Sequence, residues 1–512
     1  MHAKVFSATT IGITAHLVEV EVDLSMGMLH FFIVGLPDKA INESKDRIRA
    51  AFKNSGMKLP ERLITVNLAP ATLKKQDILF DVPIAVAIMQ ASKMVEMSSV
   101  FLHETLFLGE LSLDGAIRPV CGVLSIAHGA LRDGKKRLII PKANMQEASL
   151  IKGIEVIGVE SLVELVAYLR GEKKIDPAPC IFDQVCSERQ HNILDFDQVK
   201  GQMLAKRALQ IAAAGRHNIV FIGPPGSGKT MLAKRLATIL PAMTFDEIIE
   251  ATKVYSIAGM LGKEALVLQR PFRSPHHTIS QAGLVGGGSN PRPGEISLAH
   301  QGILFLDELT EFRRSTLEVL REPLENKHVL ISRANYAVEY PASFLLIAAL
   351  NPCPCGYYGD KKKACVCGER QISKYLAKIS GPLLDRIDLH VNVTAINYDE
   401  IKSVGVPSAS SQELYHQVEK AVKVQQARFG EMRNAFMTSD MVEKYCTLAP
   451  DAEEVMKKAF DRLNISMRGY HKILKIARTI ADIDESETIL RKHIQEAVTY
   501  RSLDQKLQGS VQ

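Results

Sequence analysis

The segment Gly223-Pro-Pro-Gly-Ser-Gly-Lys-Thr230 decides the fold of this 512-residue chain. It follows the apolar run IVFI at 219–222 and precedes MLAKRLATIL at 231–240, a pattern that predicts a strand, a tight loop and a helix. Such a loop turns its backbone N–H groups toward phosphate oxygens, and the following helix adds a partial positive charge. The alternative is an ordinary glycine-rich turn, but the flanking strand and helix favour a P-loop.

Two residues of this segment have specific roles in a P-loop. Lys229 can reach the β- and γ-phosphates of ATP, and the hydroxyl of Thr230 can bind Mg²⁺. The nucleotide-binding residues that the segment predicts are Gly223, Pro224, Pro225, Gly226, Ser227, Gly228, Lys229 and Thr230.

A second motif, Gly302-Ile-Leu-Phe-Leu-Asp-Glu308, is an apolar strand that ends in two acids. We expect Asp307 to hold Mg²⁺ through water and Glu308 to polarise the attacking water. The alternative is a strand capped by two solvated acids. A third apolar run, FLLIAAL, ends at Asn351, which lies at the carboxyl end of a neighbouring strand and can orient that water. These motifs together predict a site that hydrolyses ATP.

Longer motifs accompany the P-loop, namely PFRSPHH at 271–277, LLDRID at 383–388 and SMRGYHKILKIARTIAD at 466–482. With the second motif they resemble the AAA+ ATPases, and within them the magnesium-chelatase-like branch that contains the YifB and ComM proteins. The resemblance covers nearly the whole chain. It implies ATP and Mg²⁺ as cofactors and a homo-oligomeric ring, which is a hexamer in most relatives.

The resemblance also assigns catalytic roles to two arginines. Arg386 matches the arginine finger, which reaches the γ-phosphate of a neighbouring subunit and neutralises charge on the transferred phosphoryl group. The alternative is a surface arginine paired with Asp385 or Asp388. Arg468 matches the lid arginine called sensor 2, and this assignment depends on the family.

Residues 270–302 match the helix-2 insertion of this branch, which projects into the central channel in relatives. The segment contains the glycine-rich stretch that begins at Gly286, the pair His276-His277, and the arginines Arg270, Arg273 and Arg292. Glycines keep a loop mobile and arginines suit phosphate contact, so we expect it to touch a substrate. The alternative is that these residues only fold the insert back onto its own domain. Metal binding by the two histidines is disfavoured because adjacent side chains diverge.

The N-terminal third reads as mixed α/β structure. RLITVNLAP at 62–70 and FDVPIAVAIM at 80–89 resemble the fold of Lon protease domains and of domain 2 of ribosomal protein S5. Lon-type peptidases need a serine nucleophile, but the matching stretch Asp81-Val-Pro-Ile-Ala85 has none, so we expect a non-peptidase domain for oligomer contacts or substrate binding. The family's Lys-x-Gly is replaced here by Lys75-Gln-Asp77, whose acid would weaken a contact with DNA phosphates.

Four of the eight cysteines lie close together, as two copies of C-x-C-G: Cys353, Cys355, Cys365 and Cys367. Four thiolates suit tetrahedral Zn²⁺, and each pair precedes a glycine that permits a turn of backbone amides toward sulfur. Structural zinc sites prefer C-x-x-C, and Pro354 lacks an amide donor, so reduced thiols and an iron–sulfur cluster remain alternatives. These cysteines favour a YifB-type protein, because ComM proteins lack them.

Aromatic and basic residues lie between the two cysteine pairs, in Gly356-Tyr-Tyr-Gly-Asp-Lys-Lys-Lys363. This order is typical of a fingertip that stacks on bases and contacts phosphates. A solvated, charged loop tip is the alternative.

The fold class expected is α/β: a P-loop AAA+ core with a parallel sheet, an N-terminal α+β domain and a helical lid. The boundaries that we expect are 1–172 for the N-terminal domain, 173–193 for a linker, 194–396 for the AAA+ domain with inserts at 270–302 and 351–370, and 397–512 for the lid.

The composition and the lack of long apolar segments limit the cellular location and the class of partner that we expect. Hydrophobic residues make up 46% of the chain, and the net charge of +6 is too small to prove a nucleic-acid partner. The N-terminus lacks a secretory pattern, and no run of about 18 apolar residues occurs, so we expect a cytoplasmic protein without a membrane partner.

The function that these features favour is a ring-shaped ATPase that moves its insert loops along DNA, single-stranded or branched. The ComM resemblance suggests helicase-like branch migration in competence or recombination. The alternatives are a protein-remodelling or regulatory ATPase with a polypeptide partner, and a nucleotide-dependent scaffold.

Overall fold

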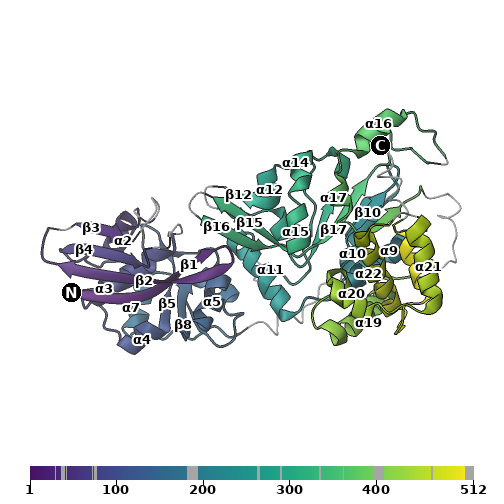
Figure 1. Cartoon of the computed structure of the whole chain (residues 1–512). Coiled ribbons are helices and arrows are strands. Elements are labelled where there is room, and N and C mark those ends of the chain that lie inside the picture. Colours follow the sequence, from purple (N-terminus) through teal and green to yellow (C-terminus); the bar gives the residue numbers. More distant parts are fainter. Residues whose placement is uncertain are drawn as a thin grey trace.

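A computed structural model describes residues 1–28, 30–35, 41, 43–71, 73, 78–180, 194–261, 266–288, 291–333, 336–360, 362–395, 409–462 and 465–501. The molecule is elongated, with an N-terminal sheet domain at one end and a second sheet with the C-terminal helices at the other (Figure 1). Within these ranges, no helix is long and apolar enough to cross a membrane. The Lys75-Gln-Asp77 segment, most of the expected linker and the expected start of the lid lie outside the described residues.

The N-terminal domain is built on a seven-stranded sheet with the order β3-β4-β2-β1-β5-β8-β9. Its strands are β1 His2–Ile11, β2 Thr14–Ser25, β3 Phe31–Val34, β4 Leu63–Ala69, β5 Thr105–Phe107, β8 Arg137–Pro141 and β9 Glu155–Val159. β2 pairs antiparallel with β1 and β4, and the other pairs are parallel. The alternating pattern of β2 puts Val18, Val20 and Val22 on the buried face.

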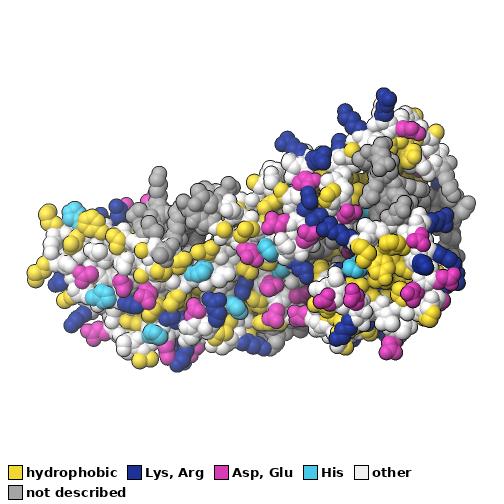
Figure 2. Space-filling model, in the orientation of Figure 1, with side chains coloured by type: hydrophobic (Ala, Val, Ile, Leu, Met, Phe, Trp, Pro, Cys, Tyr) yellow, Lys and Arg dark blue, Asp and Glu magenta, His cyan; other side chains and the backbone are white. Residues whose placement is uncertain are grey.

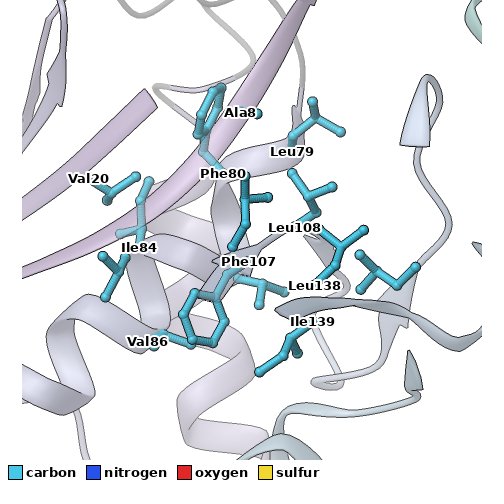
Figure 3. Packing of buried hydrophobic residues seen from close by; sticks show 14 of the residues in the cluster. Ala8, Val20, Leu79, Phe80, Ile84, Val86, Phe107, Leu108, Leu138 and Ile139 are labelled. Carbon is cyan, nitrogen blue, oxygen red and sulfur yellow. The ribbon is translucent and has the colours of Figure 1, made fainter. Parts of the chain in front are cut away.

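Helix α3 (Asp81–Ala91) lies in the centre of this domain, because its sequence DVPIAVAIMQA is apolar on nearly every side. Figure 3 shows Phe80 and Ile84 among Val20, Phe107 and Leu138, which come from three strands. The buried helix expected here is confirmed. The other helices are α2 Ser44–Asn54, α4 Ser99–Glu104, α5 Val123–Arg132, α6 Met145–Ala148 and α7 Leu162–Leu169.

The second sheet has five parallel strands in the order β11-β14-β17-β10-β18. They are β10 Ile219–Ile222, β11 Phe272–Arg273, β14 Ile303–Leu306, β17 Leu345–Leu350 and β18 Leu389–Asn392. The three apolar runs of the sequence are therefore neighbouring strands, as predicted. Because all are parallel, the segments after β10, β14 and β17 meet at one edge.

Helices surround this sheet: α9 Met203–Gly215, α10 Lys229–Ile239, α11 Phe245–Ala258, α14 Arg314–Glu318, α15 Arg321–Asn326, α16 Glu369–Leu376 and α17 Gly381–Leu384. The insert contains α12 Gln281–Val285, α13 Glu295–Leu298 and the short strands β12 Gly286–Gly287 and β13 Arg292–Pro293. A hairpin follows, with β15 His328–Arg333 and β16 Tyr336–Pro341.

The described residues from 409 onward form a helical bundle, as expected for a lid. Its helices are α19 Ser411–Phe429, α20 Ser439–Tyr445, α21 Pro450–Arg462, α22 Met467–Ile483 and α23 Arg491–Thr499. The bundle shares one hydrophobic core with α9, α10 and one face of the parallel sheet. This arrangement confirms the predicted α/β core with a C-terminal helical domain.

Helix α11 joins the two halves of the molecule. Its residues Ile248 and Ile249 belong to the core of the N-terminal domain. The hydroxyl of Ser256 accepts a hydrogen bond from the Gly122 N–H at 3.1 Å and donates to the carboxylate of Glu147. Burial raises the pKa of Glu147, while its hydrogen bonds to Ser256 and the Leu124 N–H oppose the shift. The contact is therefore a packed interface with a buried polar centre.

Candidate nucleotide and metal sites

The P-loop connects β10 to α10 in the geometry that the sequence predicted. Gly226 and Gly228 have φ of +74° and +89°, and a Cβ added at either would meet nothing within 4 Å. Gly223 is different, because an added Cβ would lie 2.1 Å from the Val393 carbonyl oxygen after β18. Glycine is thus required for backbone curvature at two positions and for close strand packing at the third.

Lys229 lies folded into the loop and is only 8% exposed. Its Nζ donates to the carbonyl oxygens of Gly223 at 2.8 Å and Pro224 at 2.9 Å, and lies 3.3 Å from Asn351 Oδ1. Burial lowers the pKa of Lys229, and the nearby carboxylates of Asp307 and Glu308 oppose that shift. An ammonium group held this way can exchange carbonyl oxygens for phosphate oxygens.

The buried hydroxyl of Ser227 has no hydrogen-bond partner among the described residues. A buried hydroxyl without a partner in a P-loop is a donor that a bound phosphate oxygen can satisfy. The residues present therefore fit a nucleotide phosphate.

Thr230 and Asp307 meet at the end of β14. Thr230 Oγ1 donates to Asp307 Oδ2 at 2.7 Å, and the other carboxylate oxygen of Asp307 accepts from the Glu308 N–H at 3.0 Å. Hydroxyl and carboxylate oxygens are the ligands that Mg²⁺ takes beside phosphates. The two residues predicted to hold Mg²⁺ thus lie side by side, and they fit that ion.

Glu308 is in a left-handed backbone conformation, with φ +51° and ψ +49°. A residue with a Cβ adopts this conformation at a cost, and such residues cluster at functional sites. Its side chain is 57% exposed, and its Oε2 lies 3.5 Å from Nδ1 of His277. The ring of His277 also stacks against His276, with centroids 4.1 Å apart, and contacts Phe312 edge-on. Sequence reasoning missed this contact between the insert and the acid.

Arg386 lies just before β18, after the short helix α17. Its guanidinium donates to Glu325 at 2.5 Å and to the Pro382 carbonyl oxygen at 2.7 Å, and it is 14% exposed. Its buried Nε has no hydrogen-bond partner among the described residues. The expected alternative was pairing with Asp385 or Asp388, whereas the structure pairs Arg386 with Glu325 of α15, which sequence reasoning did not find.

Arg468 is exposed at the start of α22. One turn further along this helix, Nζ of Lys472 lies 2.9 Å from Asp388 and donates to the carbonyl oxygens of Asp385 and Ile387. Although burial raises the pKa of Asp388, Lys472 and His217 outweigh it and leave that pKa below its ordinary value. The helix that carries Arg468 is therefore tied to the loop that carries Arg386.

Two arginines of the insert make internal ion pairs. Arg270 contacts Glu247 at 2.8 Å and three backbone carbonyl groups, and Arg273 binds both oxygens of Glu295 at 2.6 Å. Arg270 ties the start of the insert to α11, and Arg273 makes its ion pair within the insert, so both are engaged as in the alternative to substrate contact. Arg292 is exposed on β13.

The four clustered cysteines converge, with all four sulfur atoms within 4.8 Å of one another. Cys353 Sγ lies 3.3 Å from Cys355 and 3.6 Å from Cys365. In a tetrahedral Zn–S₄ site the sulfurs are about 3.8 Å apart, as follows from a Zn–S distance of about 2.3 Å. Backbone N–H groups of Tyr357 and Val366 lower the pKa of Cys355 to about 6, whereas burial and the neighbouring sulfurs raise the pKa values of Cys365 and Cys367. The donor set fits a soft metal ion.

Comparison with known proteins agrees with this geometry. Three family models match, described as magnesium chelatase, subunit ChlI (residues 195–401), subunit ChlI of Mg-chelatase (20–144) and magnesium chelatase, subunit ChlI C-terminal (408–501). A more distant match is the magnesium-chelatase 67 kDa subunit of Chlorobaculum parvum, 27% identical over 31% of this chain and 24% of that subunit.

Two relatives match over nearly their full length. The chain is 43% identical to the competence protein ComM of Haemophilus influenzae, covering 99% of this chain and 98% of ComM. It is 40% identical to YifB of Escherichia coli, covering 98% of this chain and 97% of YifB. The chain belongs to the YifB/ComM family of magnesium-chelatase-like AAA+ proteins.

Proposed function

We propose that this protein hydrolyses ATP to ADP and phosphate. The observation that carries the proposal is the meeting of Lys229, Thr230, Asp307 and Asn351 at one edge of the parallel sheet. Lys229 binds the phosphates, Glu308 accepts a proton from the attacking water, and Asn351 orients that water. Mg²⁺, held by Thr230 and Asp307, would supply charge neutralisation of the phosphates when bound.

We propose further that the active form is a homo-oligomeric ring, a hexamer. Arg386 lies at the end of α17, directly before β18, and it has to act on the nucleotide of the adjacent subunit to serve as a finger. In the single chain it is held by Glu325. The proposal therefore requires Arg386 to exchange Glu325 for phosphate when subunits assemble, while Arg468 acts on the nucleotide of its own subunit.

DNA, single-stranded or branched, is the substrate that we propose. Exposed lysines and arginines gather along one edge of the molecule, over α14, the cysteine loop and α16 (Figure 2). We call this surface the basic ridge, and its residues are Arg313, Arg314, Lys362, Lys363, Arg370, Lys374 and Lys378. Such a ridge suits a phosphate backbone. The match to a relative named a competence protein supports a role in competence. We propose that this role lies in DNA uptake or recombination, with helicase-like activity, in the cytoplasm.

The DNA proposal is tested by the ATPase rate with and without single-stranded, duplex and branched DNA. We expect stimulation that falls in the charge-reversal variant Lys362→Glu/Lys363→Glu. The matched control is Lys420→Glu/Lys423→Glu, which makes the same charge change on the exposed face of α19. Absence of DNA binding and stimulation at low salt would overturn the DNA proposal and leave the alternative of a polypeptide substrate.

We also propose that the four cysteines hold one Zn²⁺ per chain. The convergence of the four sulfurs supports this, and the amide contacts to sulfur are typical of such sites. The purified protein should contain stoichiometric zinc, and Cys353→Ser should lower the metal content. Unchanged metal content in that variant would contradict the assignment.

A further inference from the structure

The cysteine loop packs directly on the P-loop. A Cβ added at Gly356, which follows Cys355, would lie 2.5 Å from Cδ and 2.9 Å from Cγ of Pro225. Real Cβ atoms do not approach carbon so closely, so only glycine permits this contact. Pro225 is the third residue of the P-loop, and the ring of this proline therefore rests on the turn that Cys353 and Cys355 form.

The first cysteine pair packs against the ends of the two strands beside the P-loop. Cys353 is fully buried in the same hydrophobic cluster as Ile222, which ends β10, and Leu350, which ends β17. Its carbonyl oxygen accepts a hydrogen bond from the Gly356 N–H at 2.9 Å, and its sulfur accepts from the Tyr358 N–H at 3.3 Å. The turn that presses Gly356 onto Pro225 is thus organised around one sulfur atom.

Two side chains of the loop are exposed, Tyr358 at 58% and Val366 at 85%. The second cysteine pair packs against the same hydrophobic cluster as Cys353. It also approaches the first pair through sulfur, with Cys365 Sγ lying 3.6 Å from both Cys353 and Cys355. Four sulfur atoms that converge in this way form a preorganised donor set, and a metal ion bound by all four would link the two cysteine pairs into one rigid unit.

We propose that metal occupancy of the four-cysteine site sets the affinity of the P-loop for ATP. The metal holds the turn at Gly356 against Pro225 and thereby keeps the P-loop curved for phosphate. This inference rests on the zinc and nucleotide sites proposed above. It adds that the two sites are coupled, so that a change in metal content or in cysteine oxidation alters nucleotide binding.

The coupling is tested first on the full-length protein by titration with a fluorescent ATP analogue. Zinc is removed with a high-affinity chelator, verified by metal analysis, and then restored. We expect the Kd to rise about tenfold on removal and to recover on restoration, since a loop that folds around metal is lost with it. An unchanged Kd in zinc-free protein would overturn the inference.

A second experiment leaves the metal in place. Gly356→Ala adds a methyl group against Pro225, whereas the control Gly359→Ala changes a glycine of the same loop with similar φ, +78° against +84°, and no neighbour within 4 Å. Backbone strain is therefore matched, and only the steric contact differs. We expect both variants to retain zinc and Gly356→Ala alone to bind nucleotide about fivefold or more weakly.

Pro225→Ala provides a check on the contact itself. If the ring of Pro225 is the partner, Gly356→Ala should weaken binding less in the Pro225→Ala background than in the native one. Equal Kd values for Gly356→Ala and Gly359→Ala would overturn the inference while leaving zinc and ATP binding intact. Protein that never binds zinc, or never binds ATP, would instead show that a proposed site had failed.

Discussion

Nδ1 of His277 lies 3.5 Å from the carboxylate of Glu308, so a side chain of the insert contacts the acid proposed to activate water. The two residues come from segments that follow the neighbouring strands β11 and β14. A shift of the insert changes the environment of Glu308 directly. A substrate that moved the insert would therefore act on the proposed hydrolysis through this pair of side chains.

His277→Ala should raise the basal ATPase rate and reduce stimulation by DNA. A carboxylate that contacts an imidazole is less free to accept a proton from water, and a partly exposed pair is worth about 0.2–1 kcal/mol, or roughly a 1.4- to fivefold change in rate. The measurement is steady-state hydrolysis with and without DNA. His276→Ala is the control, because it removes the stacked ring but not the contact with Glu308. A lower basal rate in His277→Ala would show that the histidine assists catalysis instead.

Arg386→Ala should lower hydrolysis by roughly a thousandfold, as expected for loss of an arginine finger, with little effect on nucleotide Kd. When the variant is mixed with native protein, the ATPase rate should fall more steeply than the fraction of native subunits, because one defective subunit disables its neighbour's site. The assay is the ATPase rate against the fraction of variant. A linear decrease would show that Arg386 acts within its own chain or only structurally. Glu325→Gln, which removes the charge that holds Arg386, should not depress the rate.

Lys472→Met should destabilise the protein by about 3–5 kcal/mol, because it removes the ammonium group 2.9 Å from the buried carboxylate of Asp388 and leaves only His217 beside it among the described residues. Lys475→Met is a matched control on the same helix, since Lys475 donates to one carbonyl oxygen, that of Ala435, at 3.2 Å. Urea unfolding measures the difference. Equal losses in both variants would mean that the pair with Asp388 contributes little.

Glu147→Gln should change stability in a pH-dependent way. The pKa of Glu147 is raised in the folded protein, so the folded state binds more protons than the unfolded state between the ordinary value of 4.5 and the raised one. Native stability therefore falls as pH rises through that window, whereas the neutral variant lacks this loss. The urea midpoint of Glu147→Gln relative to native protein should rise as pH increases from about 4.5. A constant difference across pH would contradict the raised pKa.

The parallel sheet and its edge could be predicted from sequence because each strand carries its own signal. Apolar runs end at Gly223, Asp307 and Asn351, and in a parallel sheet such ends meet. Thr230 and Asp307 consequently lie within hydrogen-bond distance, although the sequence separates them widely. The buried helix α3 was equally predictable, because it is apolar around nearly its whole circumference.

Pairings between elements were not predictable. Glu325 holds Arg386, and Lys472 reaches Asp388, through the packing of α15 and α22 beside the loop before β18. Nothing local to Glu325 or Lys472 distinguishes them from other charged residues on a helix. The partner of Arg270 was not predictable either. The composition of the insert suggested that this arginine contacts phosphate, whereas in the structure it binds Glu247.

Helix α11 has a consequence for how such a protein can evolve. By sequence it belongs to the ATPase, yet Met243, Ile248, Ile249 and Leu266 lie in the core of the N-terminal domain. A gene fusion that exchanged only the first 172 residues would place a different apolar surface against α11, and the side chains of α11 would not fit it. Domain shuffling at the linker is therefore disfavoured by the core that the two parts share.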